Sequence, residues 1–254
     1  MVGDLSGHIA LVTGAGSGMG RAHAETLAAR GAHVIAQDVA DGRGAAVAET
    51  IRGMGGQADG MAGNAGDPTE MRSRVEDALA RHGKIDILVN NAGISGLQTP
   101  FLDVDEDYYD RMMDVNVKAA FFLSQMVVPG MRDQGWGRIV NVSSMFAMKG
   151  SPNAPHYTAA KGAMLGLTKA LAVELGPWNI TVNAIAPGLV KTEMTKTSLK
   201  EDAEFEARAK VIPMRRLADP ADHAKVVAFL VSDEARLMTG QTLSANGGDA
   251  IVGI

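Results

Sequence analysis

The sequence contains no cysteine. A chain without cysteine forms no disulfide, holds no cysteine-ligated metal and uses no thiolate in catalysis, so any redox chemistry needs a bound cofactor. Long apolar runs are also missing, and the first eight residues include Asp4 rather than an apolar stretch. We therefore expect no signal peptide and no membrane span, which favours a cytoplasmic protein.

A basic block is absent as well. Lys and Arg total 24 against 29 acidic residues, the formal net charge is −5, and the basic residues are scattered among the acids. This distribution does not favour nucleic-acid binding. The six histidines show neither HxH nor HxxxH spacing, so we expect no metal site. The carboxylates at 103–107 are expected to start a helix, where negative charge complements the helix dipole.

What is present is a regular alternation of short apolar runs and amphipathic stretches. With 46% hydrophobic residues in 254, the chain can bury a core large enough for a single domain over residues 1–254. The apolar runs predict strands at 9–12, 34–36, 85–89, 139–142 and 180–185, and the intervening patterns predict helices at 21–30, 44–54, 69–82, 106–131 and 157–175. Such alternation predicts an α/β fold, a doubly wound parallel sheet with helices on both faces.

One segment, residues 194–216, interrupts this alternation because it is rich in charged side chains. Two interpretations stay open: a lid over the active site, and a solvated surface helix. Its position directly after a strand end favours the lid.

A glycine-dense turn lies between the first predicted strand and the first predicted helix. Gly14, Gly18 and Gly20, with Ser17 and Met19 between them, would let a pyrophosphate approach the N-terminus of the helix, where free N–H groups favour anions. The spacing is not GxGxxG, and a merely flexible turn is the alternative. The flanking strand and helix favour the nucleotide-binding interpretation.

Asp38 ends the second predicted strand, eighteen residues after Gly20. A carboxylate there can accept hydrogen bonds from both ribose hydroxyls and would repel a 2′-phosphate. This position predicts NAD rather than NADP, although an acid closing a strand could also cap the next helix.

Tyr157 and Lys161 are four residues apart on one predicted helix, which places them on the same face. Bringing a tyrosine pKa from about 10 to near neutrality costs about 4 kcal/mol, and an ammonium about 4 Å away can supply an interaction of that order. Ser144, thirteen residues upstream, would hold the substrate oxygen against Tyr157. Taken alone, the Tyr–Lys pair is better explained by ordinary packing.

In combination, these motifs resemble the short-chain dehydrogenase/reductase family over essentially the whole chain. The resemblance rests on Thr13-Gly14 with Gly18 and Gly20, Asn90-Asn91-Ala92-Gly93, Asn116, Ser144, Tyr157 with Lys161, and Pro187-Gly188 with Thr192. It implies a Rossmann-like sheet of about seven strands and a catalytic tetrad of Asn116, Ser144, Tyr157 and Lys161. Tyr157 would be the acid/base, Lys161 would lower its pKa and bind the nicotinamide ribose, Ser144 would orient the substrate, and Asn116 would hold a water.

The same resemblance implies a wider set of cofactor-binding residues. Besides Tyr157 and Lys161 they are Gly14, Ser17, Gly18, Met19, Gly20, Asp38, Val39, Asn64, Ala65, Asn91, Ala92, Gly93, Val115, Pro187, Gly188, Val190 and Thr192. Relatives usually place an aspartate where this chain has Asn64, an exchange expected to tune the affinity for adenine. Ser143 is the alternative to Ser144, and the spacing to Tyr157 favours Ser144.

The residues expected on the substrate side are mostly apolar. They are Ser144, Met145, Phe146, Ala154, Tyr157, Leu189 and Met194, with Ser95, Gly96, Leu97 and Pro152 nearby. Because this set offers no arginine for an anionic group, we expect a neutral secondary alcohol or ketone. Lys149 could reach an anion, but a solvated loop lysine is the simpler interpretation.

The resemblance also implies a homotetramer, with the helices at 106–131 and 158–175 as the dimerising pair. The leading functional hypothesis is an NAD-dependent alcohol dehydrogenase. An NADPH-dependent 3-oxoacyl thioester reductase is the nearest enzymatic alternative. A nucleotide-sensing regulatory protein on the same fold is the alternative of another class.

Overall fold

The computed structural model describes residues 3–96, 98–196 and 201–251. Seven parallel strands form one sheet in the order β3-β2-β1-β4-β5-β6-β7. The strands are β1 (Ile9–Val12), β2 (His33–Asp38), β3 (Gln57–Ala62), β4 (Ile87–Asn90), β5 (Gly137–Val142), β6 (Ile180–Ile185) and β7 (Thr242–Leu243). The predicted doubly wound parallel sheet is confirmed.

The sequence pattern did not locate β3 and β7, which are the two edge strands. Edge strands have one unpaired side and less burial, so their sequences carry less apolar signal. Strand β3 reads QADGMA and buries only Ala58, and β7 has only two residues.

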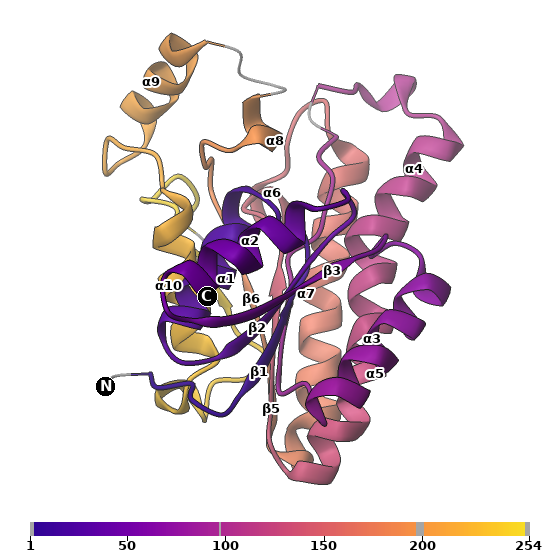
Figure 1. The fold of residues 1–254 in the computed structure, drawn as a ribbon. Helices are drawn as coiled ribbons and strands as arrows, with labels where there is room; N and C mark the ends of the chain where they lie inside the picture. Colours follow the sequence, from indigo (N-terminus) through magenta and orange to yellow (C-terminus); the bar gives the residue numbers. More distant parts are fainter. Residues whose placement is uncertain (1–2, 97, 197–200, 252–254) are drawn as a thin grey trace.

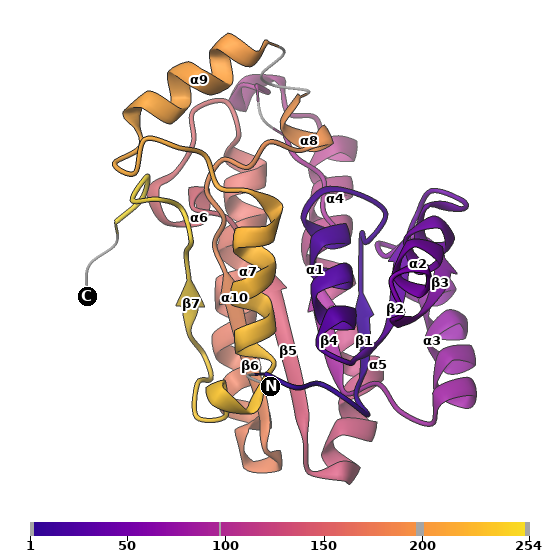
Figure 2. The same ribbon diagram turned by 60° about the vertical axis from the view of Figure 1, so that its left-hand side comes forward.

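Helices cover both faces of the sheet (Figures 1 and 2). One core cluster joins the sheet to α1 (Gly18–Ala29), α2 (Arg43–Gly53) and α10 (Pro220–Leu230). A second cluster joins the opposite face to α3 (Pro68–His82), α5 (Ala119–Gln134) and α7 (Pro155–Leu175). In the described residues, no helix combines the length and the apolar character that crossing a membrane requires.

The helix predicted at 106–131 is instead three consecutive segments. They are α4 (Glu106–Met113), a π-helical turn at Asp114–Lys118, and α5. Asp105 caps α4 by accepting a hydrogen bond from the backbone N–H of Tyr108 at 2.7 Å, so the acidic cluster starts a helix as expected. The wider turn breaks the regular helical register at Asn116, and such π-turns occur often at functional sites.

The charged segment after β6 forms two short helices at the carboxyl end of the sheet (Figure 1). These are α8 (Glu193–Lys196) and α9 (Asp202–Val211), and α6 (Phe146–Lys149) lies below them (Figure 2). Phe205 is the buried residue of α9. Residues 197–200 of the predicted lid lie outside the described residues.

Candidate functional site

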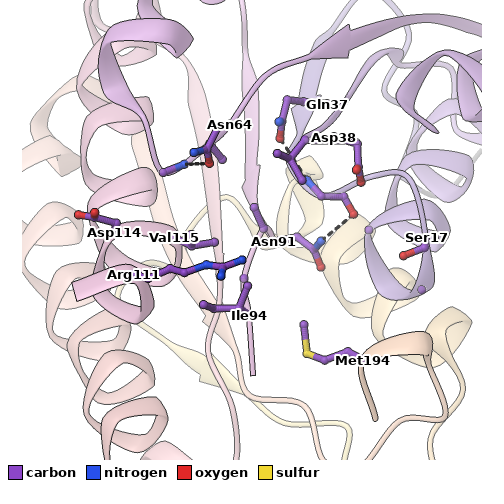
Figure 3. Close-up of a pocket in the computed structure, with 18 of the residues that line it drawn as sticks. Ser17, Gln37, Asp38, Asn64, Asn91, Ile94, Arg111, Asp114, Val115 and Met194 are labelled. Carbon is purple, nitrogen blue, oxygen red and sulfur yellow. Dashed lines mark hydrogen bonds between the residues drawn. The ribbon is translucent and has the colours of Figure 1, made fainter. Parts of the chain in front are cut away.

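A groove of about 610 Å³ runs along the carboxyl ends of the central strands. The chain reverses its direction of winding between β1 and β4, and parallel sheets bind their ligands at this point. In Figure 3, Arg111, Asp114 and Val115 lie on one side of the groove and Ser17 and Asp38 on the other. Fourteen of the predicted cofactor-binding residues line it: Gly14, Ser17, Gly18, Met19, Gly20, Asp38, Val39, Asn64, Ala65, Asn91, Ala92, Gly93, Val115 and Thr192.

The glycine turn is built so that side chains are excluded. Gly14 and Gly18 have φ angles of +61° and +53°, which L residues rarely adopt. A Cβ on Gly20 would lie 2.1 Å from the carbonyl oxygen of Gly14, inside van der Waals contact. The N-cap residue of α1, Ser17, makes no capping hydrogen bond through its side chain. The turn therefore presents the helix N-terminus to the groove, an arrangement that suits a phosphate.

Asn91 fixes this turn to the end of β4. Its Nδ2 donates to the backbone oxygen of Thr13 at 2.8 Å, and its own backbone N–H donates to Thr13 Oγ1 at 3.0 Å. Thr13 Oγ1 also accepts from the N–H of Ala92 at 2.9 Å. These contacts hold the two strand ends at a fixed distance and give the groove a rigid floor.

Asp38 lies at the rim with both carboxylate oxygens held. Oδ2 accepts from the N–H of Gly16 at 2.9 Å, and Oδ1 accepts from the N–H of Ala40 at 2.9 Å. A Cβ on Gly16 would lie 2.5 Å from Oδ2, so that position also requires glycine. Each carboxylate oxygen has a further lone pair, so the group can still accept from ribose hydroxyls.

The groove also contains residues that the sequence did not predict to bind the cofactor. They are Gln37, Gly66, Ile94, Asp107, Asp110, Arg111, Asp114, Glu193 and the substrate-side residue Met194. Gln37 connects two parts of the rim, because it accepts from the Gly14 N–H at 3.2 Å and donates to the Gly63 oxygen at 2.6 Å. Its position next to Asp38 was the only available signal. The α4 residues gave none, because only the packing of α4 brings them to the groove.

Ser144 and Tyr157 meet in a second cavity, of about 570 Å³. A hydrogen bond with the Ser144 side chain lowers the pKa of Tyr157, but burial raises it more, so the net direction is upward. Ser143 has a different task, since its Oγ donates to the backbone oxygen of Lys161 at 2.7 Å and is buried. Of the two serines, Ser144 is therefore the one that lines the cavity beside Tyr157.

Lys161 is buried beside Tyr157. Its Nζ lies 5.8 Å from the centre of the Tyr157 ring and donates to the Val142 backbone oxygen at 2.9 Å. Burial lowers the pKa of Lys161 to about 8. Burial raises the pKa of Tyr157, opposite to the lowering expected from this lysine, because desolvation dominates at both groups.

Asn116 adjoins the same point from the π-helical turn. Its Nδ2 donates to the backbone oxygens of Ile94 and Met112, both at 3.1 Å. Its Oδ1 is buried and has no hydrogen-bond partner among the described residues. A Cβ built on Gly93 would lie 2.6 Å from that oxygen and 3.3 Å from Lys161 Nζ, so both polar atoms border this glycine. An unpartnered buried acceptor beside an ammonium suits a bound water.

Only some of the predicted cofactor-binding residues after β6 line one of the two cavities. Thr192 faces Gly18, because a Cβ built on that glycine would lie 3.3 Å from Thr192 Cγ2, and Gly188 lines the second cavity. Pro187 and Val190 line neither cavity; the Pro187 oxygen accepts from the Met145 N–H at 3.0 Å. This hydrogen bond connects the segment to the loop that carries Ser144.

The second cavity differs from the predicted substrate side. Ser144, Met145, Phe146, Tyr157, Leu189 and Met194 line it as expected, together with Ser95 and Pro152. Ala154 does not, because it is fully buried at the start of α7, and Leu97 lies outside the described residues. Two cations, Lys149 and Arg208, also line it. The absence of arginine expected here was wrong, because α9 brings Arg208 over the cavity from far along the chain.

Sequence spacing also missed one cluster of possible metal ligands. Asp59 Oδ2 lies 2.9 Å from His33 Nε2 and 3.1 Å from His82 Nε2, and the ligand atoms of the three residues lie within 4.8 Å of one another. The residues come from β2, β3 and α3, so no local motif connects them. None lines the groove or the second cavity.

The chain is similar over nearly its whole length to known reductases and dehydrogenases. A family model described as enoyl-(acyl carrier protein) reductase matches residues 14–249. The 3-oxoacyl-[acyl-carrier-protein] reductase of Escherichia coli K12 is 40% identical over 245 residues, which cover 96% of this chain and 98% of that protein.

Two solved structures have nearly the same fold. A 3-ketoacyl-(acyl-carrier-protein) reductase from Brucella melitensis, complexed with NADH, is 36% identical with a TM-score of 0.91, covering 97% of this chain and 100% of the other. A candidate NAD(P)-dependent gluconate 5-dehydrogenase from Beutenbergia cavernae, with bound NADP, is 39% identical with a TM-score of 0.91, covering 97% and 98%.

Proposed function

Because this chain belongs to the short-chain dehydrogenase/reductase family, we propose that it is an NAD(H)-dependent oxidoreductase that interconverts a secondary alcohol and a ketone. The observation that carries the proposal is the position of Tyr157. It shares a cavity with Ser144 and lies beside Lys161, next to a groove that suits a dinucleotide.

The residues divide the work as follows. When bound, the dinucleotide supplies the hydride acceptor or donor. Tyr157 takes the hydroxyl proton in oxidation and returns it in reduction, and Ser144 holds the reacting oxygen against the phenol. Lys161 binds the nicotinamide ribose. The Asn116 Oδ1 holds a water through which the proton is exchanged with solvent.

Cofactor preference is assigned to NAD on the charges of the groove. Asp38 is held at the rim, and Asp107, Asp110, Asp114 and Glu193 also line the groove, against the single cation Arg111 among the described lining residues. These acids would repel a 2′-phosphate. Pro187 and Val190 are proposed to contact the nicotinamide side through their backbone.

An NADPH-dependent 3-oxoacyl thioester reductase is the second candidate, and one contact favours it. Arg43 lies beside Asp38, since both adjoin the same face of Gly16. A 2′-phosphate could use this guanidinium, which pairs with Glu193 Oε2 at 3.3 Å. Because that pair is exposed on both sides, it offers little resistance to exchange.

Parallel fluorescence titrations with NADH and NADPH distinguish the two candidates. We expect NADH to bind at least about tenfold more tightly, and Asp38→Asn to reduce that ratio, while Asp41→Asn, at a nearby exposed position, leaves it unchanged. A wild-type preference for NADPH would contradict the assignment and make acyl thioesters the first substrates to test.

Tyr157→Phe tests the acid/base role because it removes only the hydroxyl. We expect turnover to fall by about 10²–10⁴-fold, the usual contribution of a general acid/base, with the NADH dissociation constant nearly unchanged. Tyr109→Phe, at an exposed tyrosine outside both cavities, is the matched control. Retained turnover in Tyr157→Phe would refute the role. NADH binding by the wild type without turnover of any alcohol or thioester would favour the nucleotide-sensing alternative.

The predicted homotetramer is also proposed. Helix α7 leaves a stripe of small or apolar residues at least partly exposed. Among the described residues, no atom outside the helix lies within 4 Å of a Cβ built on Gly162 or Gly166. Val173, on the same helix, is 82% exposed. Such a face suits close packing against a second copy, and light scattering that gives a stable monomer at micromolar concentration would contradict it. The cytoplasmic location and the lid role of residues 194–216 stay predictions.

A further inference from the structure

The cavity beside Tyr157 has a charge pattern that the general reaction does not require. Among its described lining residues, two are cationic, Lys149 and Arg208, and none is acidic. One comes from α6, next to the loop that carries Ser144, and the other from α9. A neutral alcohol or ketone has no group that needs two positive charges.

The two cations are arranged by one carboxylate. Asp249 Oδ1 lies 3.0 Å from Lys149 Nζ, and Asp249 Oδ2 lies 3.4 Å from Arg208 NH2. The Asp249 side chain is only 10% exposed, against 33% for Lys149 and 41% for Arg208. The acid is therefore enclosed, and both cations remain accessible from the cavity. Together the three groups carry a net charge of +1, which matches a monoanion.

The segment that carries Asp249 is itself fixed. Asn246 is buried, its Nδ2 donates to the Ala250 oxygen at 2.8 Å, and its Oδ1 accepts from the Gly248 N–H at 2.8 Å. Asp249 is thus presented by a hydrogen-bonded turn. Its Oδ2 accepts a hydrogen bond from NH2 of Arg208. Because a guanidinium has five N–H donors, this contact leaves other donors of Arg208 that can reach a ligand.

The rest of the lining is rich in neutral polar groups. Besides Ser144 and Tyr157, the cavity wall includes hydroxyl and amide side chains at Ser95, Gln98, Ser151, Asn153 and Thr195. We propose that Lys149 and Arg208 bind the carboxylate of a small hydroxy-acid or oxo-acid substrate, whose carbinol or carbonyl carbon reaches Tyr157. This inference rests on the proposed function and replaces the neutral substrate expected from the sequence.

The carboxylate takes no part in the bond changes. In oxidation the carbinol C–H bond breaks and its hydride passes to the oxidised nicotinamide, while the hydroxyl proton passes to Tyr157, so alcohol and NAD⁺ give ketone, NADH and a proton. The cations fix the orientation of the substrate, and binding a remote group in this way raises the effective concentration of the reacting atoms.

A phosphate of a carrier-linked acyl thioester would offer the same cations an anion. We assign a carboxylate because the cations line the same cavity of about 570 Å³ as Tyr157, a volume typical of sites that enclose a small ligand.

The test uses 3-hydroxybutyrate and gluconate, each paired with an uncharged analogue, methyl 3-hydroxybutyrate and glucitol. Calorimetry on the protein saturated with NADH measures binding, and initial rates with NAD⁺ measure kcat/KM. The variants are Arg208→Gln and Lys149→Gln, and the control is Lys210→Gln, an exposed lysine of α9 that does not line the cavity.

We expect at least one carboxylate to be preferred over its analogue, and each cavity variant to reduce that preference about tenfold or more, while Lys210→Gln retains it. Higher salt should weaken carboxylate binding, because both cations are partly exposed. A preference that survives both cavity variants, or a wild type that binds neither carboxylate, would overturn the assignment and leave a structural ion triad.

The binding and the turnover measurements together distinguish a failure of this inference from a failure of the proposed function. Carboxylate binding that depends on Arg208, without turnover of any substrate, would support the anion site and count against the dehydrogenase. Turnover of neutral alcohols alone, unaffected by Arg208→Gln, would do the reverse. If Arg208→Gln impaired only carrier-linked 3-oxoacyl substrates, and not short free thioesters, the bound anion would be a phosphate and the carboxylate assignment would be wrong.

Discussion

The burial of the Lys161 ammonium lowers the stability of the native protein, and this effect can be measured separately from the proposed function of Lys161. The lysine is 4% exposed, and burial lowers its pKa from 10.5 to about 8. The unfolded chain therefore binds a proton at this site more tightly than the native protein does. Native stability must rise with pH wherever the unfolded state binds more protons, here between about pH 8 and 10.5.

The size of the effect follows from the two pKa values. The difference between a pKa of 10.5 and one of about 8 corresponds to about 3 kcal/mol in the free energy of unfolding. Between pH 7 and pH 9.5 the free energy of unfolding should rise by about 2 kcal/mol of this total. Lys161→Met removes the titrating group and keeps most of the side-chain volume. We expect the variant to lose this part of the pH dependence and to be more stable than wild type at pH 7, while turnover is abolished.

Guanidinium unfolding at pH 7 and pH 9.5 measures the difference, because the other groups that titrate in this range are common to both proteins. Lys169→Met, at an exposed position on the same helix, is the matched control and should keep the wild-type pH dependence. If Lys161→Met and wild type gained the same stability between these pH values, the buried ammonium would not carry the cost assigned to it.

Two further predictions concern the groove and the core. Gly20→Ala should weaken NADH binding at least about tenfold, since its Cβ would lie 2.1 Å from the Gly14 oxygen. The control is Gly130→Ala, where a Cβ meets no atom of another described element within 4 Å, and it should leave binding unchanged. Equal affinities of the two variants by fluorescence titration would refute the steric argument. Burial lowers the pKa of His23 to about 3 and that of His223 to about 4. Below pH 6.5 the unfolded chain therefore binds more protons at these two residues than the native protein does. Their contribution to the free energy of unfolding should fall by about 2–3 kcal/mol between pH 7.5 and pH 5.5. His23→Leu should remove about half of that loss in chemical unfolding, and an unchanged pH dependence would contradict the neutral buried pair.

The strongest sequence signals were those whose physics is local. Apolar runs such as Ile9–Val12 predicted the central strands because strands buried on both faces need continuous hydrophobic residues. The glycine turn and Asp38 were recognisable because each lies directly after a strand, where ligands of parallel sheets bind. Edge strands such as β3 escaped detection because their burial is partial.

Other features depend on contacts between residues far apart in the chain. No local pattern reveals that the helix at 106–131 contains a π-turn, or that this turn leaves Asn116 Oδ1 without a partner among the described residues. The pKa of Tyr157 could not be predicted from its spacing to Lys161 either. Spacing sets which face two residues share, but the extent of burial decides the direction of the shift.

The sequence by itself determined the α/β alternation and the position of the glycine turn, and its family resemblance predicts the catalytic set of Asn116, Ser144, Tyr157 and Lys161. Only the tertiary structure decided the charge of the second cavity, because Lys149 and Arg208 are 59 positions apart and meet through Asp249. The preference of a segment for helix, strand or turn depends on neighbouring residues. The electrostatics of a cavity depend instead on which distant elements the fold brings to one wall.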